Sequence, residues 1–550
     1  MPLDPVIPAA RREAMREAGL WGDDLIVDRF DRVAADRPDR VALVAHRADT
    51  GTRETFSFGQ LKRLSDRAAL ALLELGIGPG DVVAAQLPSW WHYYVLYPAC
   101  ARIGAALNPL MPIFRQRELR FMLGFPKTRL LVVPQSFRGF DYPAMIDSIR
   151  ADLPDLQHLL IAEGSDPATA FEQVLLGERR EDAPGAGERL AGMRPKSDDV
   201  TELMYTSGTT GQPKGVMHTP NTLLAKVNLA RKLFGLTGDD ATFMGSPVAH
   251  QTGFMYACVM TLSLGIKSVI QDIWEPETAA QLIQDERCSV TVASTPFLGD
   301  LVRASATTRC DVSSLRLFLC AGAPIPRVLL REAAEALPDL YVMSAWGMTE
   351  NGIVTATYPG DPEEKVFETD GKAVPTQEVR VVGEDGEVLP RGSEGRLQSR
   401  GPTHFVGYFN RPDAWLVDDD LWFETGDNAR MDEDGYIRIT GRSKDIIIRG
   451  GENVPVVEVE ELLYRHPAVQ DAAVVGVPDP RLGERGCAVV QLREGGSLDF
   501  QEMIAFLTGH ELARNYLPER LEIVDEFPRT PSGKIQKFKL RQTLSGESPT

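Results

Sequence analysis

Strand-like and helix-like segments alternate along the middle of this chain, and the alternation restricts the folds open to it. Three short apolar runs predict strands, at residues 267–270, 289–292 and 315–319. Helical spacing of apolar residues predicts three helices between and after them, at residues 277–286, 296–304 and 327–336. Strands that alternate with helices favour parallel sheets covered on both faces. We therefore expect an α/β fold.

The length and a change of texture predict more than one domain. A chain of 550 residues is too long for one ordinary hydrophobic core. Beyond residue 375, short strands with Gly/Asp turns predict an antiparallel β subdomain, and a strand-helix-strand pattern begins again after residue 445. We predict an N-terminal domain over 1–441, with two parallel-type α/β subdomains and the β subdomain, a hinge over 442–446 and a small α+β domain over 447–550.

Charge and cysteine usage exclude several classes of partner. A formal net charge of −19 argues against nucleic acid or an anionic membrane as the main partner. The six cysteines are scattered without paired or metal-ligand spacing, which predicts reduced thiols in a cytoplasmic protein. The most apolar region, 82–110, is broken by proline and charged residues and predicts a core element, not a membrane span. Residues 11–16 predict an exposed helix.

The loop at 206–215 has the composition of an anion site. Glycines allow successive backbone N–H groups to turn inward and form a nest for phosphate oxygens, and Lys214 adds a positive charge. A strand at 203–205 precedes the loop, and Thr219 with Pro220 predicts a helix start after it, so we expect the loop to join a strand to a helix. A flexible surface linker is the alternative. The candidate phosphate ligands are Thr206, Ser207, Gly208, Thr209, Thr210, Gly211 and Lys214.

Taken with later segments, these residues resemble the signature loop of the adenylate-forming (AMP-binding) enzymes. The segments at 346–350, 424–427 and 528–535 match further motifs of that family in the expected order. The resemblance covers about residues 25 to 540 and is closest to bacterial short- and medium-chain fatty acyl-CoA ligases and cyclohexanecarboxylate–CoA ligases. It implies ATP, Mg²⁺ and coenzyme A as cofactors, and a carboxylic acid as substrate.

The resemblance also assigns the nucleotide site. It implies that Trp346 stacks on adenine, that Thr349 contacts the α-phosphate and that Glu350 holds Mg²⁺ together with Thr209. A single carboxylate suffices for magnesium that also binds phosphate oxygens. The remaining residues implied to bind nucleotide are Gly322, Ala323 and Pro324 in the adenine-pocket turn, Gly347 and Met348, Asp427 on the ribose, and Arg442 near the domain junction. Taken singly, each of these motifs could be an ordinary turn or cap.

The C-terminal part carries the remaining machinery that the resemblance implies. Lys534 is expected to bridge the acyl carboxylate and the α-phosphate, and acetylation of this lysine would remove its charge and silence adenylation. Lys444 and Asp445 match the hinge about which the small domain rotates between the half-reactions. Gly450 and Gly451 are expected to line the pantetheine tunnel. A lysine acetyltransferase or deacetylase is accordingly a possible partner.

The acid is expected to be apolar. The segment at 246–254 contains no Asp or Glu, which disfavours an amino-acid substrate, and its histidine is expected to border the acyl site or to be an ordinary core histidine. The expected pocket residues are His250, Gln251, Phe254, Thr295, Phe297, Gly322 and Met348. An apolar pocket indicates a medium-chain aliphatic or alicyclic acid. Transfer of the acyl group to a carrier protein and a nucleotide-binding protein without turnover are the alternatives, and a homodimer is a further possibility.

Overall fold

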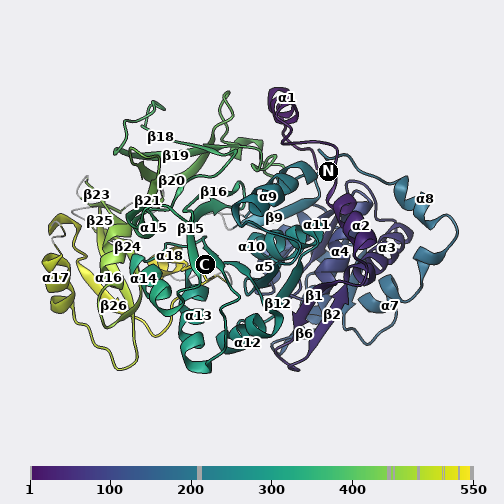
Figure 1. Cartoon of the computed structure of the whole chain (residues 1–550), viewed down its shortest axis with the longest axis horizontal. Coiled ribbons are helices and arrows are strands. Elements are labelled where there is room, and N and C mark those ends of the chain that lie inside the picture. The colour runs from purple at the N-terminus through teal and green to yellow at the C-terminus, as the bar shows by residue number, and fades with distance from the viewer. Residues whose placement is uncertain are drawn as a thin grey trace.

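The computed structural model describes residues 3–206, 213–442, 447–449, 452–479, 483–510, 512, 514–530 and 533–545 (Figure 1). Two large, mainly parallel sheets dominate it, followed along the chain by a four-stranded antiparallel sheet and a C-terminal mixed sheet. This is the α/β architecture that the alternating pattern predicted, including the antiparallel β part beyond residue 375. The predicted hinge lies almost wholly outside the described residues, so the domain boundary there stays a prediction.

The larger sheet has nine strands in the order β17-β16-β15-β14-β13-β11-β12-β1-β2. Its central pairs are parallel, whereas β2, β16 and β17 pair antiparallel at the two edges. The strands are β1 Val41–His46, β2 Arg53–Ser57, β11 Ala241–Met244, β12 Lys267–Gln271, β13 Val290–Ala293, β14 Leu317–Cys320, β15 Tyr341–Met348, β16 Gly352–Ala356 and β17 Lys372–Ala373. Parallel pairing brings the carboxyl ends of β11, β13, β14 and β15 to the same edge.

The second sheet has six strands in the order β10-β9-β4-β3-β5-β8. All its pairs are parallel except β10 with β9. The strands are β3 Val82–Ala85, β4 Ala106–Pro109, β5 Leu130–Pro134, β8 His158–Ala162, β9 Glu202–Thr206 and β10 Lys214–His218, with a separate pair of β6 Ser136–Phe137 and β7 Phe140–Asp141.

Helices between the two large sheets share one apolar cluster with both. They are α2 Ile26–Asp36, α3 Phe58–Glu74, α4 His92–Arg102, α9 Pro220–Leu233 and the run of α10 Gln251–Gly253, a π-helical turn Phe254–Val259 and α11 Met260–Leu264. Helices on the outer faces are α12 Pro276–Glu286, α13 Thr295–Thr308 and α14 Arg327–Ala336 over the nine-stranded sheet, and α5 Gln116–Gly124 and α6 Tyr142–Asp147 over the six-stranded sheet. The short helices α7 Phe171–Leu176 and α8 Ala186–Ala191 also add buried residues to the cluster that both large sheets share, and α15 Glu363–Glu368 is a further short helix.

Local signals explain the start of α9, whereas they do not predict the surroundings of the first helix. Thr219 caps α9 by accepting from the Thr222 backbone N–H, and Pro220 occupies the first position, as predicted. Helix α1 (Ala9–Glu17) also forms, but the expectation of an exposed helix is wrong at Arg11. Its guanidinium is 5 % exposed and donates to the carbonyl oxygens of Phe405 and His404, 2.9 and 2.6 Å away. Partners nearly 400 residues distant leave no local sequence signal.

The last two sheets complete the chain. The antiparallel sheet consists of β18 Glu378–Val382, β19 Glu394–Arg400, β20 Phe423–Met431 and β21 Ile437–Arg442. The C-terminal part has its own apolar core. It contains β22 Ile447–Arg449, β23 Glu452–Val454, α16 Val456–Tyr464, β24 Val469–Asp479, β25 Gly483–Leu492, α17 Phe500–Gly509, β26 Arg520–Ile523 and α18 Lys537–Ser545. Figure 1 shows these elements at the far end of the molecule from α2 and α3.

Candidate active site

Four segments of the predicted site follow the carboxyl ends of neighbouring strands in the nine-stranded sheet. They are residues 246–250 after β11, 294–295 after β13, 322–324 after β14 and 346–350 at the end of β15. Open α/β sheets bind ligands at this edge, because loops there are free to vary while the strands fix their origins. The turn after β14 begins with Gly322 at φ +87°, a backbone conformation that glycine adopts without strain.

The signature loop joins two strands, so the expectation that it leads directly into a helix is wrong. Strands β9 and β10 pair antiparallel, with Lys214 opposite Thr206, and α9 begins only after β10. Lys214 therefore lies on β10, and its Nζ is 4.7 Å from the centre of the Tyr408 ring. A bridge between Val216 and Tyr408 joins the hairpin to the segment that connects β19 and β20 of the antiparallel sheet. The hairpin fixes both ends of the loop.

Several predicted residues lie outside the described part of the chain. They are Ser207, Gly208, Thr209, Thr210 and Gly211 in the signature loop, Lys444 and Asp445 at the hinge, and Gly450 and Gly451.

The segment at 346–350 is held by close backbone packing. A Cβ on Gly347 would lie 1.8 Å from the carbonyl oxygen of Gly352, so the turn between β15 and β16 excludes any side chain there. Glu350 is 5 % exposed, and its Oε1 accepts a 2.8 Å hydrogen bond from the Tyr408 hydroxyl. Burial and the neighbouring carboxylate raise the pKa of Tyr408, so the phenol stays a donor.

Glu350 has the chemistry that a magnesium complex of ATP requires. Among the described residues Tyr408 is its side chain's hydrogen-bonding partner, and that bond engages one carboxylate oxygen. Mg²⁺ commonly takes one or two carboxylates together with phosphate oxygens. The described residues contain no group of three His, Cys, Asp or Glu side chains able to hold a metal by themselves. The donor set therefore fits an ion that arrives with phosphate.

Trp346 and Asp427 form a direct hydrogen bond across the junction of two sheets. The indole Nε1 donates to Asp427 Oδ2 at 2.8 Å, and both side chains are buried, at 8 and 6 % exposure. The indole also packs with apolar residues of the antiparallel sheet. Asp427 lies opposite Arg442 in the β20–β21 register, although the side chain of Arg442 is outside the described structure. Stacking of Trp346 on adenine stays a prediction.

The C-terminal loop that carries Lys534 packs against the start of α13. Gly533 has φ +85°, and a Cβ there would lie 2.9 Å from Ser294 Oγ and 3.1 Å from Pro296 Cγ. The Lys534 backbone N–H donates to Thr530 Oγ1 at 3.0 Å. Burial first, and then the positive charge of Lys534, lower the pKa of His250 to about 4. The charge of the predicted catalytic lysine therefore disfavours protonation of the predicted acyl-site histidine.

The expected acyl-pocket residues do not all lie together. Phe254 is fully buried between the two large sheets, where its ring meets Tyr97 edge-on at 4.8 Å. Phe297 belongs to the cluster on the opposite face of the nine-stranded sheet and packs on Trp274 at 4.7 Å. The structure therefore separates Phe254 from Phe297.

Three further expected pocket residues have distinct surroundings. Thr295 Oγ1 donates to the carbonyl of Pro324 at 2.8 Å, which joins the start of α13 to the turn after β14. Met348 packs against the cluster that contains Tyr408. Gln251 is 7 % exposed, and its side-chain amide makes no hydrogen bond with the described residues. Among the expected pocket residues, Gln251 therefore stands out as a buried side-chain amide without a hydrogen bond to a described residue.

The sequence interpretation missed a buried polar group beneath the 346–350 segment. Glu202 on β9, His218 on β10 and Lys226 on α9 are each 2 % exposed or less. Burial raises the pKa of Glu202 and lowers the pKa of both His218 and Lys226. One signal was available in the spacing: Lys226 lies three residues after Leu223 and four before Ala230, on the apolar face of the helix, where a lysine requires a partner.

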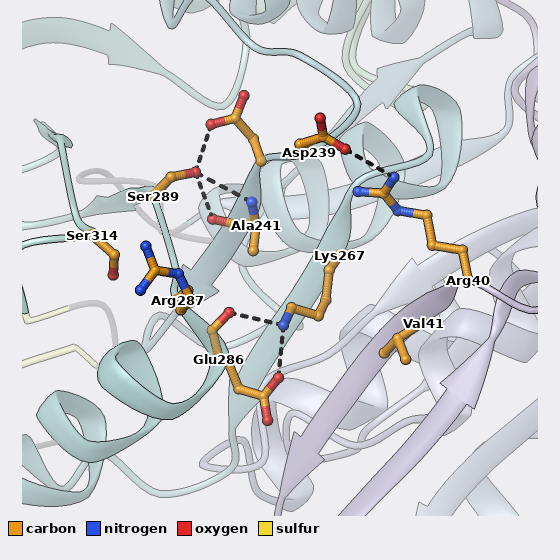
Figure 2. A pocket seen from close by; sticks show the side chains of 10 residues that line it. Arg40, Val41, Asp239, Ala241, Lys267, Glu286, Arg287, Ser289 and Ser314 are labelled. Carbon is orange, nitrogen blue, oxygen red and sulfur yellow. Dashed lines mark hydrogen bonds and ion pairs between the residues drawn. The ribbon is translucent and has the colours of Figure 1, made fainter.

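A second concave region lies at the opposite ends of the same strands. A cavity of about 500 Å³ is lined by residues at the amino ends of β1, β11 and β12. Figure 2 shows two charge pairs within the wall: Lys267 Nζ lies 2.7 Å from Glu286 Oε2, and Arg40 lies 3.5 Å from Asp239. Because these charges neutralise one another, this cavity is a weaker candidate than the carboxyl edge. No described helix is long and apolar enough to span a bilayer.

Comparison with known proteins finds matching family models, similar sequences and similar solved structures. Residues 30–409 match the family described as AMP-binding enzyme, and residues 458–534 match the AMP-binding enzyme C-terminal domain. A medium-chain fatty-acid–CoA ligase of Escherichia coli K12 is 36 % identical over 97 % of this chain and 93 % of its own. A Streptomyces salicylyl-CoA synthase / salicylate adenylyltransferase is 33 % identical, over 98 % of this chain and 97 % of its own. The crystal structure of the anthranilate-CoA ligase AuaEII with anthranoyl-AMP superposes with a TM-score of 0.84 at 25 % identity, covering 95 % of this chain and 97 % of that one.

Proposed function

The chain belongs to the AMP-binding enzyme family, and on that premise we propose that it activates a medium-chain aliphatic or alicyclic carboxylic acid. It is an acid–thiol ligase that uses ATP, Mg²⁺ and coenzyme A, as the motifs predicted. In the first step the acid's carboxylate attacks the α-phosphate of ATP and pyrophosphate leaves. In the second step the thiol of CoA attacks the acyl carbonyl, AMP leaves, and the thiol proton passes to solvent.

The residues of the carboxyl edge have complementary tasks in the first step. Lys534 supplies positive charge where the acyl carboxylate approaches the α-phosphate. Thr349 donates to the α-phosphate, and Glu350 binds the magnesium that neutralises phosphate charge. Asp427 accepts from the ribose hydroxyls, held in orientation by the indole of Trp346. His250 is neutral near pH 7, because burial and Lys534 lower its pKa, so it adds no competing cation beside the acid.

One observation supports an apolar acid more than any other. The segment from 246 to 254 after β11 has no acidic side chain to pair an ammonium group, and it ends in apolar residues, Phe254 followed by Met255, that are buried in the core. An apolar pocket favours an apolar acid. The E. coli relative, which is named for medium-chain fatty acids, agrees with this size class.

The test is pyrophosphate release with MgATP and a panel of acids, each with and without CoA. The panel runs from acetate to palmitate and includes cyclohexanecarboxylate, benzoate, salicylate and several amino acids. We expect sustained turnover only with CoA and a mid-sized apolar acid. A preference for salicylate or an amino acid would contradict the proposed substrate class.

A carrier protein is the second candidate acceptor. The Streptomyces relative is named both a CoA synthase and an adenylyltransferase, so its name includes adenylation as a separate activity. Stoichiometric pyrophosphate release that CoA does not accelerate would favour a carrier protein. The variant Lys534→Ala separates both from a non-catalytic nucleotide binder, because an enzyme loses adenylation whereas a binder retains its affinity for ATP.

A further inference from the structure

Lys226 is a buried lysine to which the two-step reaction assigns no task. It projects from α9 and is 2 % exposed. Its stem lies against the turn between β15 and β16, where a Cβ on Gly352 would be 3.1 Å from Lys226 Cε. Gly352 has φ +71°, so the backbone turns sharply and leaves space for the lysine stem. A lysine is rarely this buried unless its ammonium group is paired and hydrogen-bonded.

The ammonium group holds one particular backbone carbonyl. Lys226 Nζ lies 3.2 Å from the carbonyl oxygen of Thr349, and His218 Nε2 lies 2.9 Å from the same oxygen. The Thr222 hydroxyl donates to the Thr219 carbonyl at 3.1 Å, so it accepts from His218 Nδ1–H at 3.0 Å. This tautomer leaves Nε2 without a proton, and Nε2 accepts a 2.9 Å hydrogen bond from Lys226 Nζ, so the ammonium group joins the imidazole to the Thr349 carbonyl.

Two carboxylates surround this contact. Glu202, on the strand that leads into the signature loop, and Glu350 both attract the Lys226 charge and oppose the effect of burial on its pKa. Glu202 is fully buried, and neither of its oxygens is hydrogen-bonded to a described residue. Removing the lysine would therefore leave a buried carboxylate without its nearest cation. The lysine links β9, β10, α9 and the β15–β16 turn, four elements that reach the predicted nucleotide site.

From these contacts we propose that Lys226 is a positioning residue for adenylation, which fixes the Thr349–Glu350 peptide against the β9–β10 hairpin. The proposal rests on the roles suggested above for Thr349 and Glu350. Because Lys226 holds the Thr349 carbonyl, the peptide presents the Thr349 hydroxyl and the Glu350 carboxylate at fixed positions toward the α-phosphate and magnesium. Preorganised donors stabilise a charged transition state without having to reorient during the reaction.

The test compares three substitutions. Lys226→Met keeps an unbranched stem and removes the ammonium group, whereas Lys226→Arg keeps a cation with several donors. Lys232→Met makes the same chemical change at an exposed position of the same helix and is the matched control. The measurements are the Kd of MgATP by calorimetry without acid, the rate of acid-dependent ATP–pyrophosphate exchange, thioester formation from synthetic acyl-adenylate and CoA, and the melting temperature.

For Lys226→Met we expect the Kd of MgATP to rise and the exchange rate to fall by at least about tenfold, because two motif residues lose their fixed position. Thioester formation from preformed adenylate should fall much less, and Lys226→Arg should restore part of the exchange. Unchanged MgATP binding and exchange would overturn the proposal. Equal losses in both half-reactions together with a lower melting temperature would also overturn it, because they indicate a structural role only.

If Lys226→Met does not fold, Glu202→Gln provides the second test. It keeps the lysine but removes its nearest buried counter-charge, and we expect a smaller rise in the Kd of MgATP; an unchanged Kd would count against the proposal. If the wild-type chain binds MgATP but none of the acids tested supports ATP–pyrophosphate exchange, that result refutes the proposed function instead. The binding measurement would then still decide the role of Lys226.

Discussion

Replacing Trp346 by phenylalanine removes one hydrogen bond from the base of the predicted ribose site and leaves an aromatic ring in place. The lost bond joins the indole Nε1 to Asp427 Oδ2 at 2.8 Å, with both groups almost fully buried. A hydrogen bond to a charged acceptor contributes about 1.5–3 kcal/mol to stability, and a loss of ATP affinity of the same size, about 10- to 150-fold, is the upper bound on what its removal can cause. Part of this is recovered if the carboxylate finds another donor, so we expect the lower end.

The assay is the Kd of ATP and of 2′-deoxy-ATP for the wild-type chain and for Trp346→Phe. We expect the Kd of ATP to rise about tenfold and the preference for ATP over 2′-deoxy-ATP to shrink, because a misoriented carboxylate recognises the ribose hydroxyls poorly. Trp415→Phe is the control: its ring packs on Phe405 at 4.9 Å, and its indole nitrogen makes no hydrogen bond with the described residues. An unchanged Kd and an unchanged preference in Trp346→Phe would refute the reasoning.

Three other predictions use different measurements. A histidine NMR titration should find the pKa of His250 near 4, and a higher pKa in Lys534→Ala, because removing a nearby cation favours protonation. Since the pKa of an unfolded histidine is about 6.5, the free energy of unfolding linked to His250 is lost as the pH falls from 6.5 towards 4. Gly347→Ala should unfold the chain or lower its stability by several kcal/mol, since its Cβ would lie 1.8 Å from the Gly352 oxygen, whereas Gly187→Ala, with open space on α8, should change stability by less than about 1 kcal/mol. Acetyl-lysine incorporated at position 534 should abolish pyrophosphate release with acid present, and normal release would contradict the assigned charge of Lys534.

Local rules predicted the regular elements well where short-range chemistry determines them. Helix α14 has the predicted bounds, Arg327–Ala336, and Thr219 with Pro220 begins α9 as expected. Strand β10 was missed, because the five residues from Lys214 to His218 follow directly on a glycine-rich loop and show no alternation of polar and apolar side chains. Its strand conformation comes from pairing with β9 across the loop and from contact with Tyr408; the strand at β9 was predicted, but the pairing and the distant Tyr408 partner were not.

Residues that become important only through distant contacts escaped the sequence analysis. Lys226 meets Thr349 across 123 positions of the chain, and Arg11 meets Phe405 across 394. A lone lysine or arginine is usually a solvated surface charge, so composition and spacing place both residues outside. The predicted catalytic residues lie within short motifs, so the sequence alone could indicate them. The residues that support them, such as Lys226 and Arg11, come from distant parts of the chain and are brought together only by the fold.

These supporting contacts reach one peptide segment from two sides. On one side, Lys226 Nζ donates to the carbonyl of Thr349 and is itself held by His218. On the other side, the backbone N–H of Phe405 donates to the carbonyl of Glu350 at 2.7 Å and the Tyr408 hydroxyl holds the carboxylate. The segment that carries Phe405 and Tyr408 is paired to β10 and anchored by Arg11. Strand β10 belongs to the hairpin that holds both ends of the signature loop, so a displacement of Glu350 would also reach the hairpin that carries the predicted phosphate ligands. Substitutions in the supporting contacts should therefore impair MgATP binding.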